Sequence, residues 1–247
     1  MNRLLPRRAS RFFVPAKLSP GAEIELPEGA ARHCGVLRLH RGEAVILFNG
    51  EGGEFVAELT QVSRDRVLAR PTSKQTPERE SPLAVELAQC VSSGDRMDAA
   101  IQKSTELGVS RIVPIASGRS VVKLAGQRAE RRVAHWRNVA IAACEQCGRN
   151  RIPEIAAVTD IQTFLSGADA SSLRLLLAPE AAQELKSLPR PGSVTLLVGP
   201  EGGLAPEERQ SAERHGFIAV RFGPRVLRTE TAPLAAIAAM QALWGDC

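Results

Sequence analysis

The stretch Val194-Thr-Leu-Leu-Val-Gly-Pro-Glu-Gly-Gly-Leu204 is an uncharged, mainly apolar run followed at once by a glycine-rich turn. The run 194–198 is typical of a strand that is buried on both faces of a parallel sheet. The three glycines of the turn lack a Cβ, so the backbone there can approach a ligand closely. Residues 206–215 follow with a proline in the first turn, which predicts a helix. Together these features predict one strand–loop–helix unit of an α/β domain.

The same alternation of strands and helices extends over residues 83–247. The expected strands are 83–88, 111–115, 173–177, 194–198 and 217–222, and the expected helices are 95–107, 125–147, 206–215 and 233–244. Strands that alternate with helices predict a parallel sheet. Ligands of such sheets bind beyond the carboxyl ends of the strands.

The first seventy residues have a different pattern, with short runs of β-forming residues separated by turns. Strands are expected at 36–39, 44–48, 54–59 and 66–69, with Asn49-Gly-Glu-Gly-Gly53 as a hairpin connection because no helix follows these glycines. Short strands at this spacing predict a small barrel. Residues 70–82 are polar and contain three prolines, which predicts a linker. We therefore expect two domains, residues 1–72 and 73–247.

Composition narrows the class of protein. A chain of 247 residues with 44% hydrophobic residues can bury a core, and its net charge of +5 mildly favours a polyanionic partner. No run is long and apolar enough to span a membrane, and the N-terminus lacks the apolar part of a signal peptide, so we expect a cytoplasmic protein. Cys144 and Cys147 form an isolated C-x-x-C pair on a predicted helix. Two buried thiols are expected there, and no metal.

The N-terminus is locally basic, with Arg3, Arg7, Arg8 and Arg11 and no acidic residue among them. Such a cluster can neutralise RNA phosphates and release counterions. A solvated basic terminus explains the same charges equally well.

A second candidate loop is Phe222-Gly-Pro-Arg-Val-Leu-Arg-Thr-Glu-Thr-Ala232, between the last strand and the last helix. Neither this loop nor Gly199–Gly203 matches the dinucleotide or nucleoside triphosphate fingerprints. An NAD-dependent enzyme is therefore disfavoured. From the residues alone, a ligand site and glycines that serve only packing remain open alternatives.

The two loops together resemble those of the knotted methyltransferases of the SPOUT superfamily. The whole chain resembles one family within it, the RsmE-type 16S rRNA uridine N3-methyltransferases. The matching pieces run in family order and are Arg11-Phe-Phe-Val14, Lys103-Ser-Thr-Glu-Leu-Gly108, Arg119-Ser-Val-Val122, Glu145-Gln-Cys-Gly-Arg-Asn-Arg151, Val198-Gly-Pro-Glu-Gly-Gly203 and Gly223-Pro-Arg-Val-Leu-Arg-Thr-Glu-Thr-Ala232.

The resemblance implies an architecture and partners. The N-terminal domain would be a PUA-like β-barrel that helps to bind RNA. The C-terminal domain would be a SPOUT-type parallel sheet with a deep trefoil knot, which is an exception to the usual rule against threaded loops. The chain would form a homodimer with the active site completed at the subunit interface, use S-adenosyl-L-methionine, and act on 16S rRNA within the small ribosomal subunit.

The resemblance also assigns a cofactor site to the two loops and to the strand end at Leu177-Ala-Pro179. Apolar walls are expected from Leu197, Leu204, Val226 and Leu227. The full set of expected cofactor-binding residues is Leu177, Leu197, Val198, Gly199, Pro200, Glu201, Gly202, Phe222, Gly223, Val226, Leu227, Thr231 and Ala232.

Two residues of the second loop are candidates for the chemistry. Arg228 is always charged and suits the negative charge that develops on a base as it is methylated, although a salt bridge with Glu230 is the alternative. Glu230 is the candidate general base, or it orients Arg228. Glu201 would offset the sulfonium charge or hold its loop.

RNA contacts are expected from arginines outside the cofactor loops, namely Arg7, Arg8, Arg11, Arg119, Arg149 and Arg151. Arg128, Arg131 and Arg132 are interpreted as a solvated helix face. Trp136 lies three residues from both Val133 and Val139, a helical spacing that favours packing over base stacking. Two other functions stay open: an RNA-binding module without chemistry, and a methyltransferase with a different target base.

Overall fold

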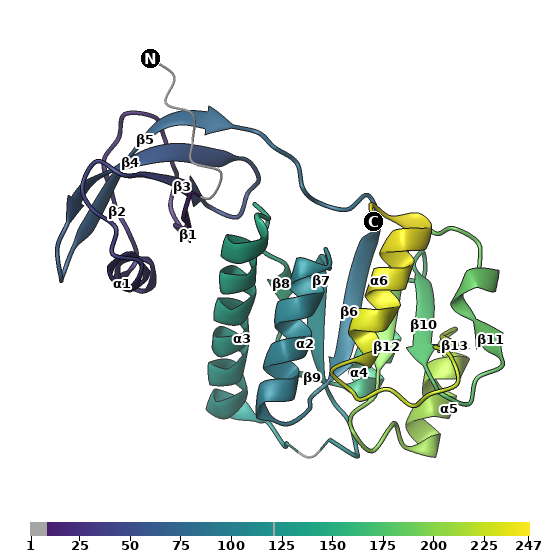
Figure 1. Cartoon of the computed structure of the whole chain (residues 1–247). Coiled ribbons are helices and arrows are strands. Elements are labelled where there is room, and N and C mark those ends of the chain that lie inside the picture. Colours follow the sequence, from purple (N-terminus) through teal and green to yellow (C-terminus); the bar gives the residue numbers. More distant parts are fainter. Residues whose placement is uncertain (1–8, 121) are drawn as a thin grey trace. The chain divides into compact units, whose positions relative to one another are not determined.

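The computed structural model describes residues 9–120 and 122–247, and the chain divides into two compact units (Figure 1). The first unit consists of Met1–Glu80 together with Cys144–Ile152, and the second of Ser81–Ala143 together with Pro153–Cys247. The expected boundary at residues 72 and 73 falls inside strand β5 (Val67–Gln75). Arg7 and Arg8 lie outside the described residues.

The predicted linker over 70–82 is partly wrong, because its first residues belong to β5. Pro71 lies opposite Ala57, where the register between β4 (Glu54–Val62) and β5 shifts. A proline is tolerated in a strand at such an irregularity. The side chains of residues 72–75 are exposed, which explains why this part of the strand resembles a linker in composition.

The first unit contains a five-stranded sheet in the order β1-β3-β4-β5-β2. The short strand β1 (Arg11–Phe13) runs parallel to β3 (Ala44–Phe48), and β2 (Ile24–Glu25) pairs with β5. Among the described residues no pairing joins β1 to β2, so the expected small barrel is an open sheet in this structure. The predicted hairpin is confirmed, since β3 and β4 are antiparallel and Gly50, Gly52 and Gly53 have positive φ.

The strand predicted at 36–39 is wrong. Residues Glu28–Val36 form helix α1, and Arg38 just beyond it has a φ of 54°, which turns the chain out of the helix. Val36 and Leu37 are exposed, whereas Leu39 is half-buried against the core, so this apolar stretch does not have the buried face of a strand. Cys34 on α1 instead packs with Phe12, Leu47 and Leu59 beneath the sheet.

The second unit is built on an eight-stranded, wholly parallel sheet. The five long strands were all predicted: β6 (Ala84–Cys90), β7 (Arg111–Ala116), β10 (Leu173–Leu177), β12 (Ser193–Val198) and β13 (Ile218–Arg221). The path through the sheet is β11-β13-β10-β12-β6-β7-β8, with β9 beside β7. The short strands are β8 (Glu154–Ile155), β9 (Thr159–Asp160) and β11 (Gln183–Glu184).

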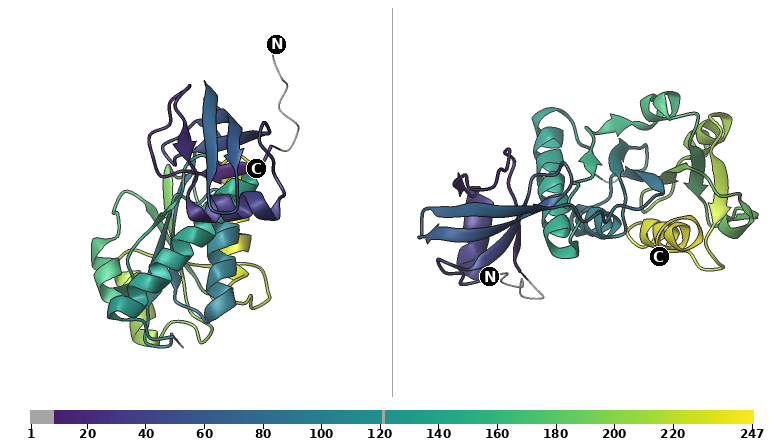
Figure 2. Two further views of the ribbon diagram at one scale, coloured as in Figure 1. Left: turned by 90° about the vertical axis from the view of Figure 1, so that its left-hand side faces the viewer. Right: turned by 90° about the horizontal axis from the view of Figure 1, so that it is seen from above.

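Helices cover both faces of this sheet (Figure 2). On one face α2 (Gly94–Glu106) packs against α6 (Ala232–Trp244), and on the other α4 (Ile161–Gly167) packs against α5 (Pro206–Arg214). The remaining helical segments are α3 (Gly126–Cys147) and a short 3-10 turn, η1 (Leu185–Ser187). No helix in the described parts of the chain is long and apolar enough to cross a membrane.

Trp136 of α3 is fully buried, and its indole N–H donates to Asp98 of α2 at 3.2 Å. The expected packing role of this side chain is therefore confirmed.

Strand order determines where a site can form. β10 lies between β12 and β13, so the loops that follow these three strands leave the same edge of the sheet side by side. These are the two glycine-containing loops and the segment that begins at Ala178. Periodicity in the sequence predicts the strands, but it contains no information on this order.

Candidate active site

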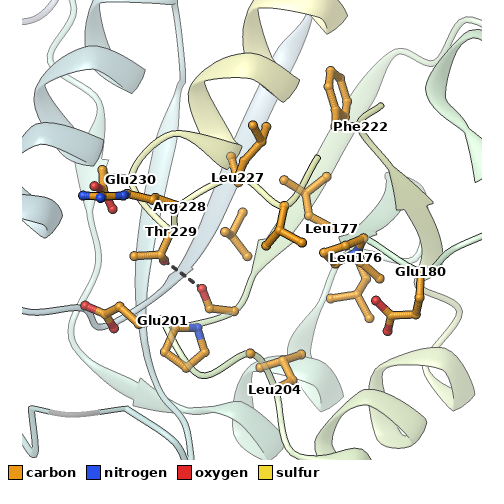
Figure 3. Close-up of a pocket in the computed structure, with 18 of the residues that line it drawn as sticks. Leu176, Leu177, Glu180, Glu201, Leu204, Phe222, Leu227, Arg228, Thr229 and Glu230 are labelled. Carbon is orange, nitrogen blue, oxygen red and sulfur yellow. Dashed lines mark hydrogen bonds between the residues drawn. The ribbon is translucent and has the colours of Figure 1, made fainter. Parts of the chain in front are cut away.

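The three neighbouring loops enclose a cavity of about 570 Å³ at the carboxyl edge of the sheet (Figure 3). That volume is in the range of small-molecule sites, which are mostly apolar with a few placed polar groups. Leu177, Leu204, Phe222 and Leu227 supply apolar surface. Figure 3 shows Glu201 and Glu230 on one side of the cavity and Glu180 on the other.

Most residues expected at the cofactor site line this cavity: Leu177, Val198, Gly199, Pro200, Glu201, Phe222, Val226, Leu227 and Ala232. The cavity lining does not include four others, namely Leu197, Gly202, Gly223 and Thr231. Leu197 is fully buried in the sheet, because its side chain packs into the core with Ala88 and Leu176. Arg228 and Glu230 both line the cavity.

Several lining residues were not predicted. Arg96 comes from the first turn of α2, Arg209 from α5, and Leu176 and Val220 from the ends of strands. A single sequence contains no signal for Arg96, which resembles any solvent-facing arginine of an amphipathic helix. Its place in the site depends on the tertiary fold.

The two glycine-containing loops are joined by a hydrogen bond. The Thr229 hydroxyl donates to the Gly199 carbonyl oxygen at 2.9 Å (Figure 3). Gln89, fully buried on β6, donates from Nε2 to the Thr229 hydroxyl oxygen at 3.1 Å. The second loop is therefore attached both to the first loop and to a central strand.

Gly199 leaves little room for a side chain. A Cβ at this position would lie 3.2 Å from the Leu204 backbone nitrogen and 3.4 Å from two backbone atoms of Gly203. The turn closes tightly on itself at the point where β12 ends. The φ of Gly199 is not positive, so backbone conformation does not explain the glycine. The close approach of the neighbouring backbone does.

Glu201 is held by the start of α2. Its Oε1 accepts from the Ser93 backbone N–H and hydroxyl, each at 3.2 Å, and from Arg96 at 2.9 Å. Burial alone would raise the pKa of Glu201, but hydrogen bonds from backbone N–H groups, Arg96 and the Ser93 hydroxyl outweigh it and lower the pKa below its ordinary value. The carboxylate is therefore ionised at neutral pH.

Arg96 also faces Glu230. Its Nε lies 4.0 Å from Glu230 Oε2, an atom that is buried and has no hydrogen-bond partner among the described residues. One guanidinium therefore lies between two carboxylates that belong to different loops. This oxygen of Glu230 therefore has an unused acceptor position beside Arg96, although neighbouring atoms cover it in this structure.

Other charges in the cavity differ in their pairing. Glu180 is paired with Arg209. Arg119 donates to the Gly202 carbonyl oxygen at 3.1 Å. Within the described parts of the chain, Arg119, Arg225 and Arg228 have no acidic partner within ion-pair distance. The expected alternative of an Arg228–Glu230 salt bridge is therefore not observed.

The structure corrects the expectation for two RNA-contact arginines. Arg149 is buried and paired with Glu80, and Arg11 is paired with Glu54 and hydrogen-bonded to Asn150. Both guanidinium groups are occupied within the first unit, so neither is presented to a phosphate. Arg151 is half-exposed, 4.0 Å from Glu78. Arg119 lies at the cavity.

The expectation of two buried thiols in the C-x-x-C pair is only partly right, because Cys147 is half-buried. Cys144 is buried, and burial raises the pKa of its thiol to about 12. Among the residues the structure describes, no three His, Cys, Asp or Glu side chains are grouped to bind a metal ion.

Comparison with known proteins places this architecture in a family. An RNA methyltransferase domain family matches residues 79–241, and an RNA methyltransferase PUA domain family matches residues 26–72. Ribosomal RNA small subunit methyltransferase E of Buchnera aphidicola (from Schizaphis graminum) is 32% identical over 98% of this chain and 99% of its own length. The Bacillus subtilis enzyme of that name is 33% identical over 83% of this chain and 84% of its own.

Comparison with solved structures supports the same family assignment. A ribosomal RNA small subunit methyltransferase E from Neisseria gonorrhoeae, bound to S-adenosyl methionine, superposes with a TM-score of 0.91 at 43% identity over 97% of this chain and 99% of that one. A Legionella pneumophila protein solved with bound SAM gives a TM-score of 0.94 at 41% identity over 97% and 100%. On this similarity, over nearly the whole length and in both parts, the chain belongs to the ribosomal RNA small subunit methyltransferase E family.

Proposed function

We propose that this chain transfers a methyl group from S-adenosylmethionine to N3 of a specific uridine in 16S rRNA of the small ribosomal subunit. Membership of an rRNA methyltransferase family, with relatives solved bound to the cofactor, supports SAM-dependent methylation of rRNA. The observation that carries the proposal is the cavity itself, in which apolar walls, the carboxylates of Glu201 and Glu230 and the unpaired Arg228 converge from neighbouring loops.

The residues of the cavity fit the cofactor. The adenine ring suits the apolar surface of Leu177, Leu204, Phe222 and Leu227. The positive sulfonium suits the side that carries Glu201 and Glu230. The tight backbone turn at Gly199 lets main-chain groups approach a ligand without an intervening Cβ.

When bound, this cofactor supplies an electrophilic methyl group. The protein must then position the uridine N3 behind that group and remove the N3 proton. Glu230 accepts the proton on a carboxylate oxygen, and the electron pair left on N3 forms the new bond to the methyl carbon. Arg228 stabilises the negative charge that spreads onto the neighbouring ring carbonyl oxygens. The bond from carbon to sulfur breaks, and its electrons neutralise the sulfonium.

Arg96 has a positioning role in this scheme. It lies between Glu201 and Glu230, donating to Glu201 at 2.9 Å and approaching Glu230 Oε2 to 4.0 Å. It thereby fixes the position of the Glu230 carboxylate relative to the cavity while Glu201 holds its own loop against α2.

Four finer features are part of the proposal. We propose a trefoil knot in the C-terminal part, a homodimer that completes the site, the assembled small subunit as the cytoplasmic site of action, and a functional division near residue 72. The family resemblance supports the first three. Sedimentation equilibrium of the purified chain tests whether it forms a dimer. A monomeric mass at all protein concentrations would exclude the dimer.

The decisive experiment is to locate the modified nucleotide. Small-subunit rRNA from cells that lack this protein is digested and compared with parental rRNA by mass spectrometry. We expect one N3-methyluridine to disappear and to return when the purified chain and S-adenosylmethionine are added to the subunits. If a different methylated base disappears, the proposed methyltransferase activity stands, but the assignment of N3 of uridine as the target is wrong. An unchanged methylation pattern would overturn the proposal itself.

A further inference from the structure

Besides the arginines of the N-terminus, one short segment of this chain is strongly basic. Residues 119–132 contain five cations and one acid, a net charge of +4 in a chain whose total is +5. We call the cationic side chains of this segment the basic strip: Arg119, Lys123, Arg128, Arg131 and Arg132. Outside this segment and the basic residues 1–11, the rest of the chain has a net charge of −3.

The basic strip begins at the mouth of the proposed active site. Residues 117–120 follow β7 and therefore leave the carboxyl edge of the parallel sheet, as the cavity loops do (Figure 1). Two contacts attach this turn to the first cavity loop and its helix. The Gly118 N–H donates to Glu208 Oε1 at 2.7 Å, and Arg119 donates to the Gly202 carbonyl oxygen.

From there the strip continues onto the first two turns of α3. Arg131 and Arg132 lie three and four residues after Arg128, which places both beside it on the helix surface. Arg128 and Arg131 are exposed, and the Arg132 guanidinium lies 5.6 Å from the centre of the Trp136 ring.

Internal pairing does not account for these charges. None of the five cations lies within ion-pair distance of an acidic side chain of residues 9–120 or 122–247, and Glu130 is likewise unpaired there. Helix stability does not account for them either. The first turn of α3 has no acidic residue, although acids there would be favourable and cations are not. Many other arginines, such as Arg66, Arg111 and Arg221, are paired with acids.

We propose that the basic strip binds the phosphates of the RNA strand that leads to the target base, so that the strand runs from the cavity mouth at Arg119 along the start of α3. The proposal rests on the proposed function for the identity of the partner as RNA. It replaces the interpretation of Arg128, Arg131 and Arg132 as a solvated helix face with a binding role.

The test compares two double variants of the full-length protein. The first is Arg128→Gln with Arg131→Gln. The matched control is Arg190→Gln with Arg214→Gln, which removes the same charge from exposed arginines of the second unit. Arg190 precedes β12 and Arg214 ends α5, so both lie at the opposite edge of the sheet from the cavity. Binding of a short fluorescent single-stranded RNA is measured by anisotropy over a series of salt concentrations.

The basic strip predicts a change in the salt dependence of RNA binding. Loss of two phosphate contacts should reduce the magnitude of the log K against log salt slope by about 1.4, at about 0.7 for each contact with a single strand. The control pair should leave the slope unchanged. Cofactor binding by calorimetry should be unaltered in both variants. Equal slopes for the first variant and the parent, or equal losses in both variants, would overturn the proposal.

The binding measurement is independent of the proposed chemistry. A parent chain that binds RNA with the expected salt slope but methylates nothing would refute the proposed function and leave the strip in place. If the first variant binds RNA like the parent but binds purified small subunits more weakly, the strip contacts ribosomal protein instead, and the proposal of an RNA surface is wrong.

Discussion

Arg228 and Arg96 line the same cavity, but only Arg96 is held by carboxylates. This difference separates their expected roles. An arginine without an acidic partner can use its positive charge to stabilise negative charge on a reacting base. The charge of an arginine between two glutamates is already used in holding those carboxylates. The chemistry of the site therefore depends on which arginine is left free.

Replacing Arg228 with alanine should reduce the methylation rate by about 10²–10³-fold, the usual loss when one transition-state donor is removed. Single-turnover assays on small subunits measure the chemical step, and calorimetry should show that cofactor affinity is largely kept. Arg228→Lys should recover part of the rate, because it restores the charge without the planar donors. A parental rate for Arg228→Ala would show that this residue has no role in the transition state.

Arg96→Gln should lower kcat by roughly tenfold to a hundredfold through misplacement of Glu230, with a smaller effect on the KM for RNA. The matched control is Lys103→Gln, which removes another α2 cation paired with a carboxylate, Glu106, outside the cavity. If Arg96 acts through Glu230, its substitution should have little further effect in a Glu230→Gln background. A full additional loss in that background would contradict a positioning role.

At the scale of residues, local sequence was informative only where the site is contiguous. Arg228 and Glu230 could be chosen because they belong to one loop at a strand end. Arg96 could not, since more than a hundred residues separate it from Glu201. Arg149 was assigned wrongly to RNA because its burial depends on Glu80, a partner in a distant segment.

The first cavity loop depends on close packing of its own backbone. A methyl group at Gly199 would press on the Leu204 backbone nitrogen at 3.2 Å and force the turn to open by a few tenths of an ångström. Gly199→Ala should therefore weaken cofactor binding, measured by calorimetry, by roughly tenfold, equivalent to about 1.4 kcal/mol. Gly192→Ala is the control, because a Cβ there would have no neighbour within 4 Å and φ is not positive. Equal affinities for the two variants would exclude this role for Gly199.

At the scale of elements, periodicity predicted the five long parallel strands, since each is an apolar run. It missed α1, because Val36-Leu-Arg-Leu39 alternates like a strand although the helix ends there. It also missed α4, a short helix whose start is stabilised by Asp160 accepting from the backbone N–H groups of Gln162 and Thr163. Strand order depends on contacts between distant segments, so no local pattern could predict it.

Glu54 links the stability of the whole molecule to pH. Its side chain is 5% exposed and paired with Arg11 and Arg79. Burial would raise its pKa, but hydrogen bonds and charge from Arg79 and Arg11 outweigh this and hold the pKa below its ordinary value of 4.5. A lowered carboxyl pKa contributes stability that is fully present above the unfolded value and is lost as pH falls through the folded value.

Glu54→Gln should therefore reduce the free energy of unfolding at neutral pH by about 3 kcal/mol, the cost of breaking a buried ion pair. The difference from the parent should narrow as pH falls below the ordinary value of 4.5 and through the lowered pKa of Glu54, where the parent loses the stability that this carboxylate contributes. Urea unfolding at several pH values measures this difference in the free energy of unfolding. Glu58→Gln, on the exposed side of the same strand, should change little at any pH. A difference that is independent of pH would show that the charge of Glu54 is not responsible.

The first unit draws on two separate stretches of chain, and this has a consequence for synthesis on the ribosome. Arg11 contacts Asn150, so the N-terminal stretch cannot complete its network until residues 81–143 have also been translated. The N-terminal stretch is therefore synthesised before residues Cys144–Ile152 of its own unit, and the first strands of the parallel sheet are synthesised in between. Because chains usually fold domain by domain as they are made, this interleaving couples completion of the first unit to growth of the second.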